Sequence, residues 1–189
     1  MPIVALVMQP HPIVLEFIAH AEITLGEISD VGPVPTGHRR VIPITGGHLA
    51  GPLLDATILP GGADWQIVSP DGTAIIDSRY SAATADGAQL YIATQGFRYG
   101  PPEVISRLAA GEDVARDEYS FRLSVRIECG SPNLMWVNRT IFVATAARQR
   151  ASVTYDLYSI NRCEARLRVR LTRLERSHPV LLIEGRQPC

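Results

Sequence analysis

The sequence predicts an all-β protein, a single closed antiparallel β-barrel with one short helix. Three observations lead to this fold class. Glycine and proline recur at short intervals along the chain. Most segments between them have the length of a strand and alternate apolar with polar residues, which is typical of sandwiches and barrels. Only one segment has the spacing of a helix, and 189 residues suit one domain.

The alternating segments predict the strands in chain order. They are expected at residues 20–28, 39–45, 55–59, 65–68, 73–83, 88–95, 119–128, 134–145 and 152–159. A loop is expected over 32–37, Gly46-Gly47 should end the second strand, and Pro60-Gly61-Gly62 the third. The helix is expected over 102–110, where proline lies near the start and glycine follows the end.

These elements predict one barrel domain over residues 17–160, preceded by an N-terminal extension over 1–16. The tail over 161–189 is rich in arginine. Its residues 164–171 alternate charged with apolar side chains, which is a strand pattern, and a frayed appendage fits it nearly as well. No internal repeat or second core is present in the sequence.

The composition argues against several functional classes. The formal net charge is −1, so no strong basic field attracts nucleic acid or an anionic membrane. Every basic residue other than histidine is arginine, which excludes Schiff-base lysine chemistry. Cys129, Cys163 and Cys189 are far apart and form no CxxC pair. We therefore expect no zinc site, no disulfide framework and a reduced, cytoplasmic setting.

Targeting and cofactor motifs are not found either. Residues 1–17 are apolar but lack a basic start and are interrupted by prolines, so neither a signal peptide nor a membrane span is expected. The sequence contains no GxSxG, HExxH, GxGxxG or P-loop motif. The five histidines have no metal-like spacing. We therefore expect no cofactor and no metal.

One short stretch stands out as a candidate site. In Gly61-Gly62-Ala63-Asp64-Trp65, two glycines allow a sharp bend before a strand that presents a carboxyl group beside an indole. A carboxyl group against an apolar ring has a raised pKa and can act as an acid or a base near neutral pH. The alternative is a structural aspartate that caps the turn.

Asp86-Gly87 between two strand-like segments predicts a hairpin with a two-residue turn. This register sorts the side chains of the two strands onto opposite faces. One face is expected to carry Asp77, Arg79, Ile92 and Thr94. The other is expected to carry Tyr80, Tyr91, Ala93 and Gln95.

A second hairpin is expected to join residues 119–128 to 134–145. Alternation separates an apolar face from a polar one. The apolar face is Phe121, Leu123, Val125 and Ile127. The polar face is Arg122, Ser124, Arg126 and Glu128, which Trp136, Asn138 and Thr140 are expected to join. Trp136 is then placed near Arg126 as a cation–π partner.

Which face lines the barrel stays open at this point. If the arginine and glutamate face is the solvated exterior, phenylalanine and leucine fill the interior. If the barrel encloses a polar pocket, the buried charges must be paired, because each unpaired one costs several kcal/mol. A ligand site is the usual place where that cost is tolerated.

The same residues resemble the uncharacterised family known as domain of unknown function 3237. The matching motifs, in order, are RVIPITGG (40–47), PGGADWQ (60–66), DGT (71–73), DSRY (77–80), DG (86–87), GFR (96–98), FR (121–122), Glu128, WVNR (136–139) and FV (142–143). The resemblance covers about residues 17–160. It implies a β-barrel similar to allene oxide cyclase and lipocalin-like barrels, with no agreed reaction. The recurring polar positions of the family match Asp64, Arg79, Arg122, Glu128 and Asn138.

Together these observations favour a cofactor-independent acid–base enzyme, an isomerase, cyclase or lyase, that acts on a small and largely apolar molecule. Asp64 or Glu128 is the expected acid or base, and Arg79 and Arg122 are expected to stabilise a developing anion. The expected substrate-binding residues are Tyr80, Tyr91, Trp65, Trp136 and Asn138. The alternatives are a non-catalytic ligand carrier and a homo-oligomer whose arginine-rich tail adds a strand to a neighbour.

Overall fold

The computed structural model describes residues 12–162, and these form strands and two short helices. The strands are β1 (Ile13–Leu25), β2 (Ser29–Val34), β3 (Gly37–Ala50), β4 (Ala56–Ile58), β5 (Gly62–Val68), β6 (Ala74–Ala83), β7 (Gln89–Tyr99), β8 (Ser120–Cys129), β9 (Phe142–Arg148) and β10 (Ser152–Arg162). The helices are α1 (Pro102–Ala109) and the 3₁₀ helix η1 (Pro132–Arg139). The predicted 161–189 tail lies almost entirely outside the described residues.

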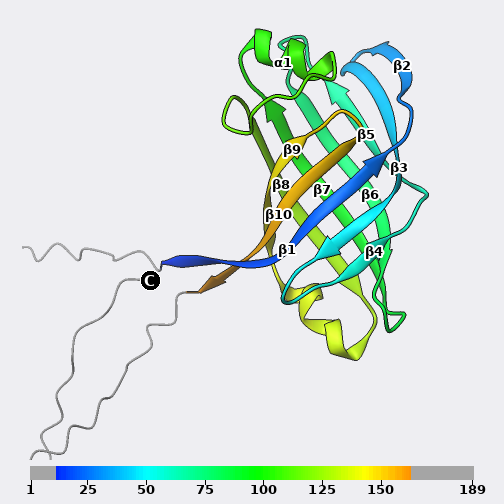
Figure 1. The fold of residues 1–189 in the computed structure, drawn as a ribbon, viewed down its shortest axis with the longest axis vertical. Coiled ribbons are helices and arrows are strands. Elements are labelled where there is room, and N and C mark those ends of the chain that lie inside the picture. The colour runs from blue at the N-terminus through cyan, green and yellow to red at the C-terminus, as the bar shows by residue number, and fades with distance from the viewer. Residues whose placement is uncertain (1–11, 163–189) are drawn as a thin grey trace, which may run out of the picture. The chain divides into compact units, whose positions relative to one another are not determined.

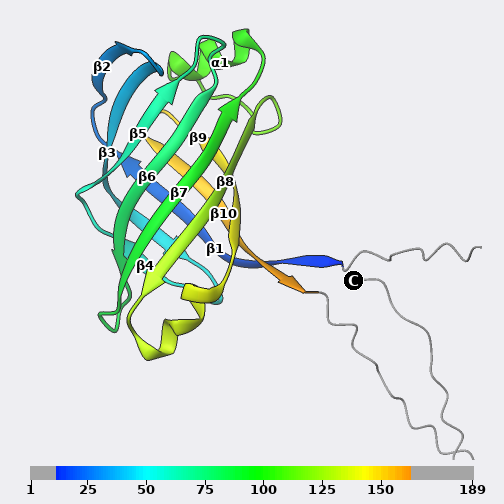
Figure 2. The same cartoon turned by 180° about the vertical axis from the view of Figure 1, so that it is seen from behind.

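Eight of the described strands close into an antiparallel barrel, which confirms the predicted fold class. Neighbouring strands in the chain pair from β5 through β10, β10 lies beside β1, and β1 pairs with β3 (Figures 1 and 2). Because β3 also pairs with β5, the sheet returns to itself. β2 and β4 are additional strands that pair with parts of β3. Closure leaves few exposed sheet edges.

β3 changes its neighbours halfway along its length. Its residues 38–44 pair with β5, whereas residues 47–49 pair with β4. Gly46 and Gly47 lie at the change, with φ angles of 150° and 137°. A Cβ atom on Gly47 would lie 2.1 Å from the carbonyl oxygen of Glu22 on β1. The prediction that this glycine pair ends the strand is therefore wrong, since it lets β3 bend and continue.

Three other predicted boundaries also change. β1 begins at Ile13 rather than at residue 20, and ends at Leu25. The segment 32–37, predicted to be a loop, contributes its first residues to β2. β7 continues to Tyr99, beyond the predicted end at residue 95.

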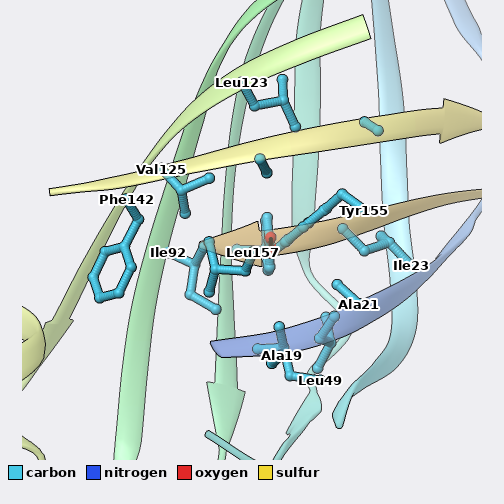
Figure 3. Close-up of a cluster of buried hydrophobic side chains, with 14 of the residues drawn as sticks. Ala19, Ala21, Ile23, Leu49, Ile92, Leu123, Val125, Phe142, Tyr155 and Leu157 are labelled. Carbon is cyan, nitrogen blue, oxygen red and sulfur yellow. Dashed lines mark hydrogen bonds between the residues drawn. The ribbon is translucent and has the colours of Figure 1, made fainter. Parts of the chain in front are cut away.

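Apolar side chains fill the middle of the barrel. Phe121, Leu123, Val125 and Ile127 on β8 are buried, and the alternating polar residues of the strand are exposed. Figure 3 shows side chains from several strands meeting in one cluster. Those labelled include Leu49, Ile92, Leu123, Val125, Phe142, Tyr155 and Leu157. The apolar face of β8 is thus the inner face, and its arginine and glutamate face is the outer one.

The predicted helix is confirmed as α1, which covers the barrel end where β7 finishes and β8 starts (Figure 1). Val104 and Leu108 are its buried residues. Ile105 lies against Gly72 in the turn between β5 and β6, and Gly111, just after the helix, lies against Arg150 in the turn between β9 and β10. α1 therefore spans this end from one turn to the other.

The prediction of a continuous strand over 134–145 is wrong. Residues 132–139 form η1 at the opposite end of the barrel from α1 (Figure 1), and β9 starts only at Phe142. The Asn138 side chain holds the helix against the end of β8, because its Oδ1 accepts from the Cys129 N–H (3.1 Å) and its Nδ2 donates to the Cys129 carbonyl (2.8 Å). Trp136 meets Phe142 edge to face, with ring centroids 5.9 Å apart.

The hairpin between β6 and β7 has a different register from the predicted one. Tyr80 pairs with Ile92, and Ser81 with Tyr91. The connection runs over residues 84–88, where the Thr84 hydroxyl accepts from the Ala88 N–H (2.9 Å). A shift of one residue turns the side chains of a whole strand to the other face. Tyr80 consequently points inward with Ile92, and Tyr91 points outward.

No helix among residues 12–162 has the length and apolar character needed to cross a bilayer.

Candidate functional site

A pocket in the barrel interior lies toward the end that α1 covers, since Arg98 near the end of β7 and Phe121 at the start of β8 line it. It contains about 500 Å³ of space free of protein atoms, a volume that includes the part open to solvent, and the cavity within it measures about 40 Å³. Aliphatic side chains form most of its wall, among them Ile23, Leu25, Ile42, Ile44, Ile76 and Leu123. Its polar groups are Asp64, Gln66, Ser78, Thr94, Arg98, Arg148 and Tyr155.

Asp64 is the acidic residue in this wall. It lies on β5, where Gly61 at φ 111° sets the bend before the strand and alternation directs residues 64 and 66 inward. Only 9% of Asp64 is exposed. Its Oδ1 accepts from the backbone N–H of Asp77 (3.0 Å), and its Oδ2 accepts from Nε2 of Gln66 (2.9 Å).

Burial raises the pKa of Asp64 above its ordinary value of 3.8, although the hydrogen bonds from Asp77, Gln66 and Ser78 oppose the rise. The raised pKa agrees with the predicted behaviour of this carboxyl group, but the predicted cause is wrong. Trp65 follows on the same strand and points to the outer face, where it is 37% exposed. The apolar barrel interior, rather than the indole, desolvates Asp64.

Gln66 connects Asp64 to an arginine on the neighbouring strand. Arg40 pairs with Gln66 across β3 and β5, and the Arg40 guanidinium donates to Gln66 Oε1. The amide then donates from its Nε2 to Asp64. This chain fixes the orientation of the amide, because one side accepts from a cation and the other donates to a carboxyl group.

Arg98 points inward from β7, one strand beyond Ser78 and β6. It is 9% exposed, and its guanidinium carbon lies 6.0 Å from the centroid of the Phe121 ring. Burial lowers the pKa of Arg98 to about 10, with the positive charges of Arg148 and Arg40 contributing. The group still carries its charge at neutral pH.

Arg148 at the end of β9 adds a third guanidinium to the same end of the barrel. Burial lowers its pKa, and Arg40 lowers it further. Arg148 donates to the carbonyl oxygens of Ser152 and Arg150, both at 3.4 Å. The ion pairs found within residues 12–162 involve other groups, so none of the three arginines lies within 4.0 Å of the Asp64 carboxyl oxygens.

Two tyrosines lie deeper in the barrel. Their hydroxyl groups, on Tyr80 and Tyr155, are 2.7 Å apart and hydrogen bonded. Burial raises the pKa of Tyr155 to about 12 and that of Tyr80 well above 10. Both phenols are therefore neutral hydrogen-bonding groups, and Tyr155 also reaches the pocket wall.

Three of the predicted catalytic residues do not reach Asp64. Arg79, Arg122 and Glu128 lie on the outer wall, because each alternates with buried neighbours on its strand. Arg79 pairs with Asp77 (3.1 Å) and lies 5.7 Å from the Trp65 ring centroid. Glu128 pairs with Arg126. The structure therefore does not bring these three residues together with Asp64, and any role for them requires a site on the outer surface.

The predicted binding residues also divide between the two sides of the wall. Tyr91, Glu128 and Asn138 border a shallow groove on the outside, although both polar ends of the Asn138 amide are bonded to Cys129. Trp136 packs against Phe142 at the end closed by η1, and the cation–π contacts within residues 12–162 are made by Arg79 and Arg98 rather than by Arg126. Tyr80 is therefore the predicted binding residue that the structure places inside with Asp64.

Sequence reasoning missed Arg40, Gln66, Arg98, Arg148 and Tyr155. Alternation along the strand could have identified Arg98, because it lies an even number of residues after Ile92 and Thr94 and so shares their inward face. Arg98 was missed because the predicted strand ends at residue 95, whereas β7 continues to Tyr99. Among the residues the structure describes, no group of three or more histidine, cysteine, aspartate or glutamate side chains has the geometry of a metal site.

The structure is therefore a closed β-barrel with an interior pocket near one end. The pocket wall is largely apolar and includes a buried carboxyl group and two arginines. Residues 13–160 match the model of a family described as "Protein of unknown function (DUF3237)", and the chain belongs to this family. This bears out the resemblance found in the sequence motifs.

Individual relatives agree with this assignment. A crystal structure of a β-barrel-like protein from Acinetobacter baumannii is similar, with 42% identity and a TM-score of 0.71, over 81% of this chain and 99% of that one. A UPF0311 protein from Rhodopseudomonas palustris is 37% identical over 136 residues, which are 72% of this chain and 89% of the relative. A more distant relative from Penicillium herquei, named a hydroalkoxylation enzyme, is 28% identical over 72% of this chain and 86% of its own.

Proposed function

We propose that this protein is a cofactor-independent acid–base enzyme that acts on a small, largely apolar organic molecule in the barrel interior. The observation that carries the proposal is Asp64, a nearly buried carboxyl group with a raised pKa in a pocket with mostly aliphatic walls. Such a group exchanges protons more readily near neutral pH than an exposed aspartate does. The arginines beside it supply positive charge for an anionic intermediate.

The chemistry that suits this site is the addition of a hydroxyl group across a conjugated C=C bond, or the reverse elimination. The Asp64 carboxylate accepts the hydroxyl proton while the oxygen forms a bond to the far carbon of the double bond. The electron pair moves onto the conjugated carbonyl as an enolate. Asp64 then returns the proton to the near carbon, so atoms and charge balance without an oxidant or a reductant.

This class covers the isomerase, cyclase and lyase activities expected from the sequence. Ring closure is the addition within one molecule, the lyase reaction is its reverse, and isomerisation moves the proton alone. The name of the Penicillium herquei relative, a hydroalkoxylation enzyme, describes addition of this kind and supports the proposal.

The test is a turnover assay with hydroxyl-bearing enones, beginning with 2′-hydroxychalcone, whose ring closure removes a strong absorption band. Wild-type protein is expected to accelerate closure, and Asp64→Asn to lower kcat by roughly a hundred- to ten-thousand-fold, because the amide cannot carry the proton. Asp55→Asn is the matched control, since the Asp55 side chain is mostly exposed and pairs with His48. Equal rates for wild type and Asp64→Asn would contradict the assignment.

A ligand carrier is the second candidate, and one observation favours it. Phe121 and Leu123 line the same pocket as Asp64, so apolar contact supplies most of the wall. In a carrier, Asp64 and the arginines only orient the ligand. A ligand that binds in the pocket and is recovered unchanged after long incubation supports the carrier, and formation of product excludes it.

A further inference from the structure

The charges of the pocket do not balance. The barrel end that α1 covers brings together the guanidinium groups of Arg40, Arg98 and Arg148. The charges of Arg148 and Arg40 contribute to the lowered pKa of Arg98, and Arg40 contributes to that of Arg148. Asp64 is the acidic side chain of the wall. The phenols of Tyr80 and Tyr155 stay neutral. Positive charge is therefore in excess where solvent is largely removed.

Part of the hydrogen-bonding capacity of these groups is unused. Within residues 12–162, the Nε atoms of Arg40 and Arg98 are buried and have no hydrogen-bond partner. The terminal nitrogen of Arg40 donates a hydrogen bond to Gln66, and Arg148 donates to two carbonyl oxygens in the turn between β9 and β10. Arg98 lies across the Phe121 ring and is 9% exposed. Arg98 is thus the cation with the least satisfied guanidinium.

Such an arrangement is unfavourable without a counter-charge. Burial disfavours an unpaired charge, and neighbouring like charges disfavour it further. Natural proteins retain strained or unsatisfied groups of this kind mainly where a ligand completes them. A carboxylate or phenolate oxygen is the natural complement, because charge-assisted hydrogen bonds to guanidinium are among the strongest in proteins.

We propose that the ligand of this pocket is an organic anion whose charged oxygen is bound by Arg98 and Arg148, with its apolar body against the aliphatic wall. The inference deepens the proposed function, since it names the substrate class of the same site. Ile42, Ile44 and Leu123 form an apolar surface beside the arginines, which a small inorganic anion leaves uncovered. The complete ligand therefore combines one anionic oxygen group with a hydrocarbon or aromatic body.

The test measures binding to the full chain with two matched pairs of probes. 4-Nitrophenol, largely ionised at pH 8, is compared with neutral 4-nitroanisole, and 4-nitrobenzoate with its methyl ester. Titration by calorimetry at pH 8 gives each affinity. We expect at least one anion to bind roughly tenfold or more tightly than its neutral partner. The two pairs show whether a phenolate or a carboxylate is preferred.

Arginine variants then locate the binding group. Arg98→Gln is expected to reduce the preference for the anion by roughly tenfold, with Arg148→Gln as a second variant at the same end. Arg126→Gln is the matched control, because Arg126 lies on the outer wall and pairs with Glu128. An unchanged preference in both pocket variants contradicts the inference. If neither variant folds, equal affinity of wild-type protein for each anion and its neutral partner overturns it.

These outcomes are separate from those of the turnover assay. If the protein prefers anions but turns over no enone, the proposed substrate class stands as a ligand class and the protein is a carrier of organic anions. If turnover depends on Asp64 but charged and neutral probes bind equally well, the proposed enzymatic function stands and only the proposed substrate class is overturned.

Discussion

At the residue scale, Arg98 is a buried cation whose surroundings disfavour its charge. It is nearly buried, its Nε has no partner, and burial lowers its pKa to about 10. Hydrophobic residues of similar volume often replace such buried ions with no loss of stability. Arg98 therefore contributes little to the folding of the ligand-free protein.

A substitution tests this directly. Arg98→Met is expected to leave the free energy of unfolding unchanged or to increase it by roughly 1–4 kcal/mol, because it removes an unpaired buried charge and keeps most of the volume. Chemical denaturation of the ligand-free protein measures the effect. A loss of roughly 3–5 kcal/mol, which is the range for breaking a buried ion pair, would show that Arg98 has a structural partner after all.

The sequence located one polar residue of the pocket well. Asp64 stood out because the two preceding glycines and the strand pattern set its place, and both features are local. Arg98 and Arg148 could not be selected in the same way. Each is one of many arginines, and only the register of the strands shows that it points inward. Arg122 and Glu128 have the same local pattern and point outward.

At the element scale, the sequence predicts most strand boundaries to within a few residues, but it does not predict which side chains point into the barrel. The hairpin between β6 and β7 contains Asp86-Gly87, which indicates a two-residue turn. The observed connection is longer because Thr84 bonds to Ala88 through both backbone and side chain. A side-chain bond of this type is not visible as a pattern, and one residue of difference moved Tyr80 inside and Tyr91 outside.

The prediction that residues 134–139 begin a strand is wrong for a related reason. The apolar residues of this segment are spaced in a way that suits either structure when the segment is short. Pro132 at the helix start and the bonds from Asn138 to Cys129 favour the 3₁₀ helix. These bonds join residues nine positions apart, so they become evident only in the folded chain.

Close contact between strands gives a second prediction. A Cβ atom on Gly96 of β7 would lie 2.0 Å from the carbonyl oxygen of Arg122 on β8. Gly96→Ala should therefore destabilise the protein by about 1–3 kcal/mol through local overpacking. Gly130→Ala is the matched control, because no atom lies within 4 Å of its Cβ position. Thermal unfolding of the two variants compares them, and equal midpoints would contradict the close approach.

At the scale of the whole molecule, the barrel fold was predicted correctly, because alternation and turn residues recur along the entire chain. The choice between a polar and an apolar interior was left open, and the structure combines the two. Apolar side chains fill the middle, and charged groups gather at the end that α1 covers. Alternation cannot reveal such a division along the barrel axis, because it indicates which face of a strand a side chain is on and not how far along the barrel it lies.

The buried carboxyl group should make stability depend on pH. Since burial raises the pKa of Asp64 above 3.8, folding takes up a proton at this residue when the pH lies between its unfolded and folded values. The contribution of Asp64 to stability therefore falls as the pH rises through this window, and stays at its lower level above it. Asp64→Asn lacks this dependence.

The measurement is urea denaturation of both proteins between pH 4 and pH 8. The free energy of unfolding of wild type minus that of Asp64→Asn is expected to decrease as the pH rises. A difference that increases with pH would mean that the hydrogen bonds from Gln66 and Asp77 outweigh burial and lower the pKa instead.

The closure of the barrel also orders its assembly in time. β1 lies between β3 and β10, so the first described strand of the chain acquires its second neighbour only when the last one exists. On the ribosome, the nascent sheet keeps open edges at β1 and β9 until residues near 160 have left the exit tunnel. A translation arrest before that point should leave a chain that cannot complete its own seam and that depends on chaperones to remain unaggregated.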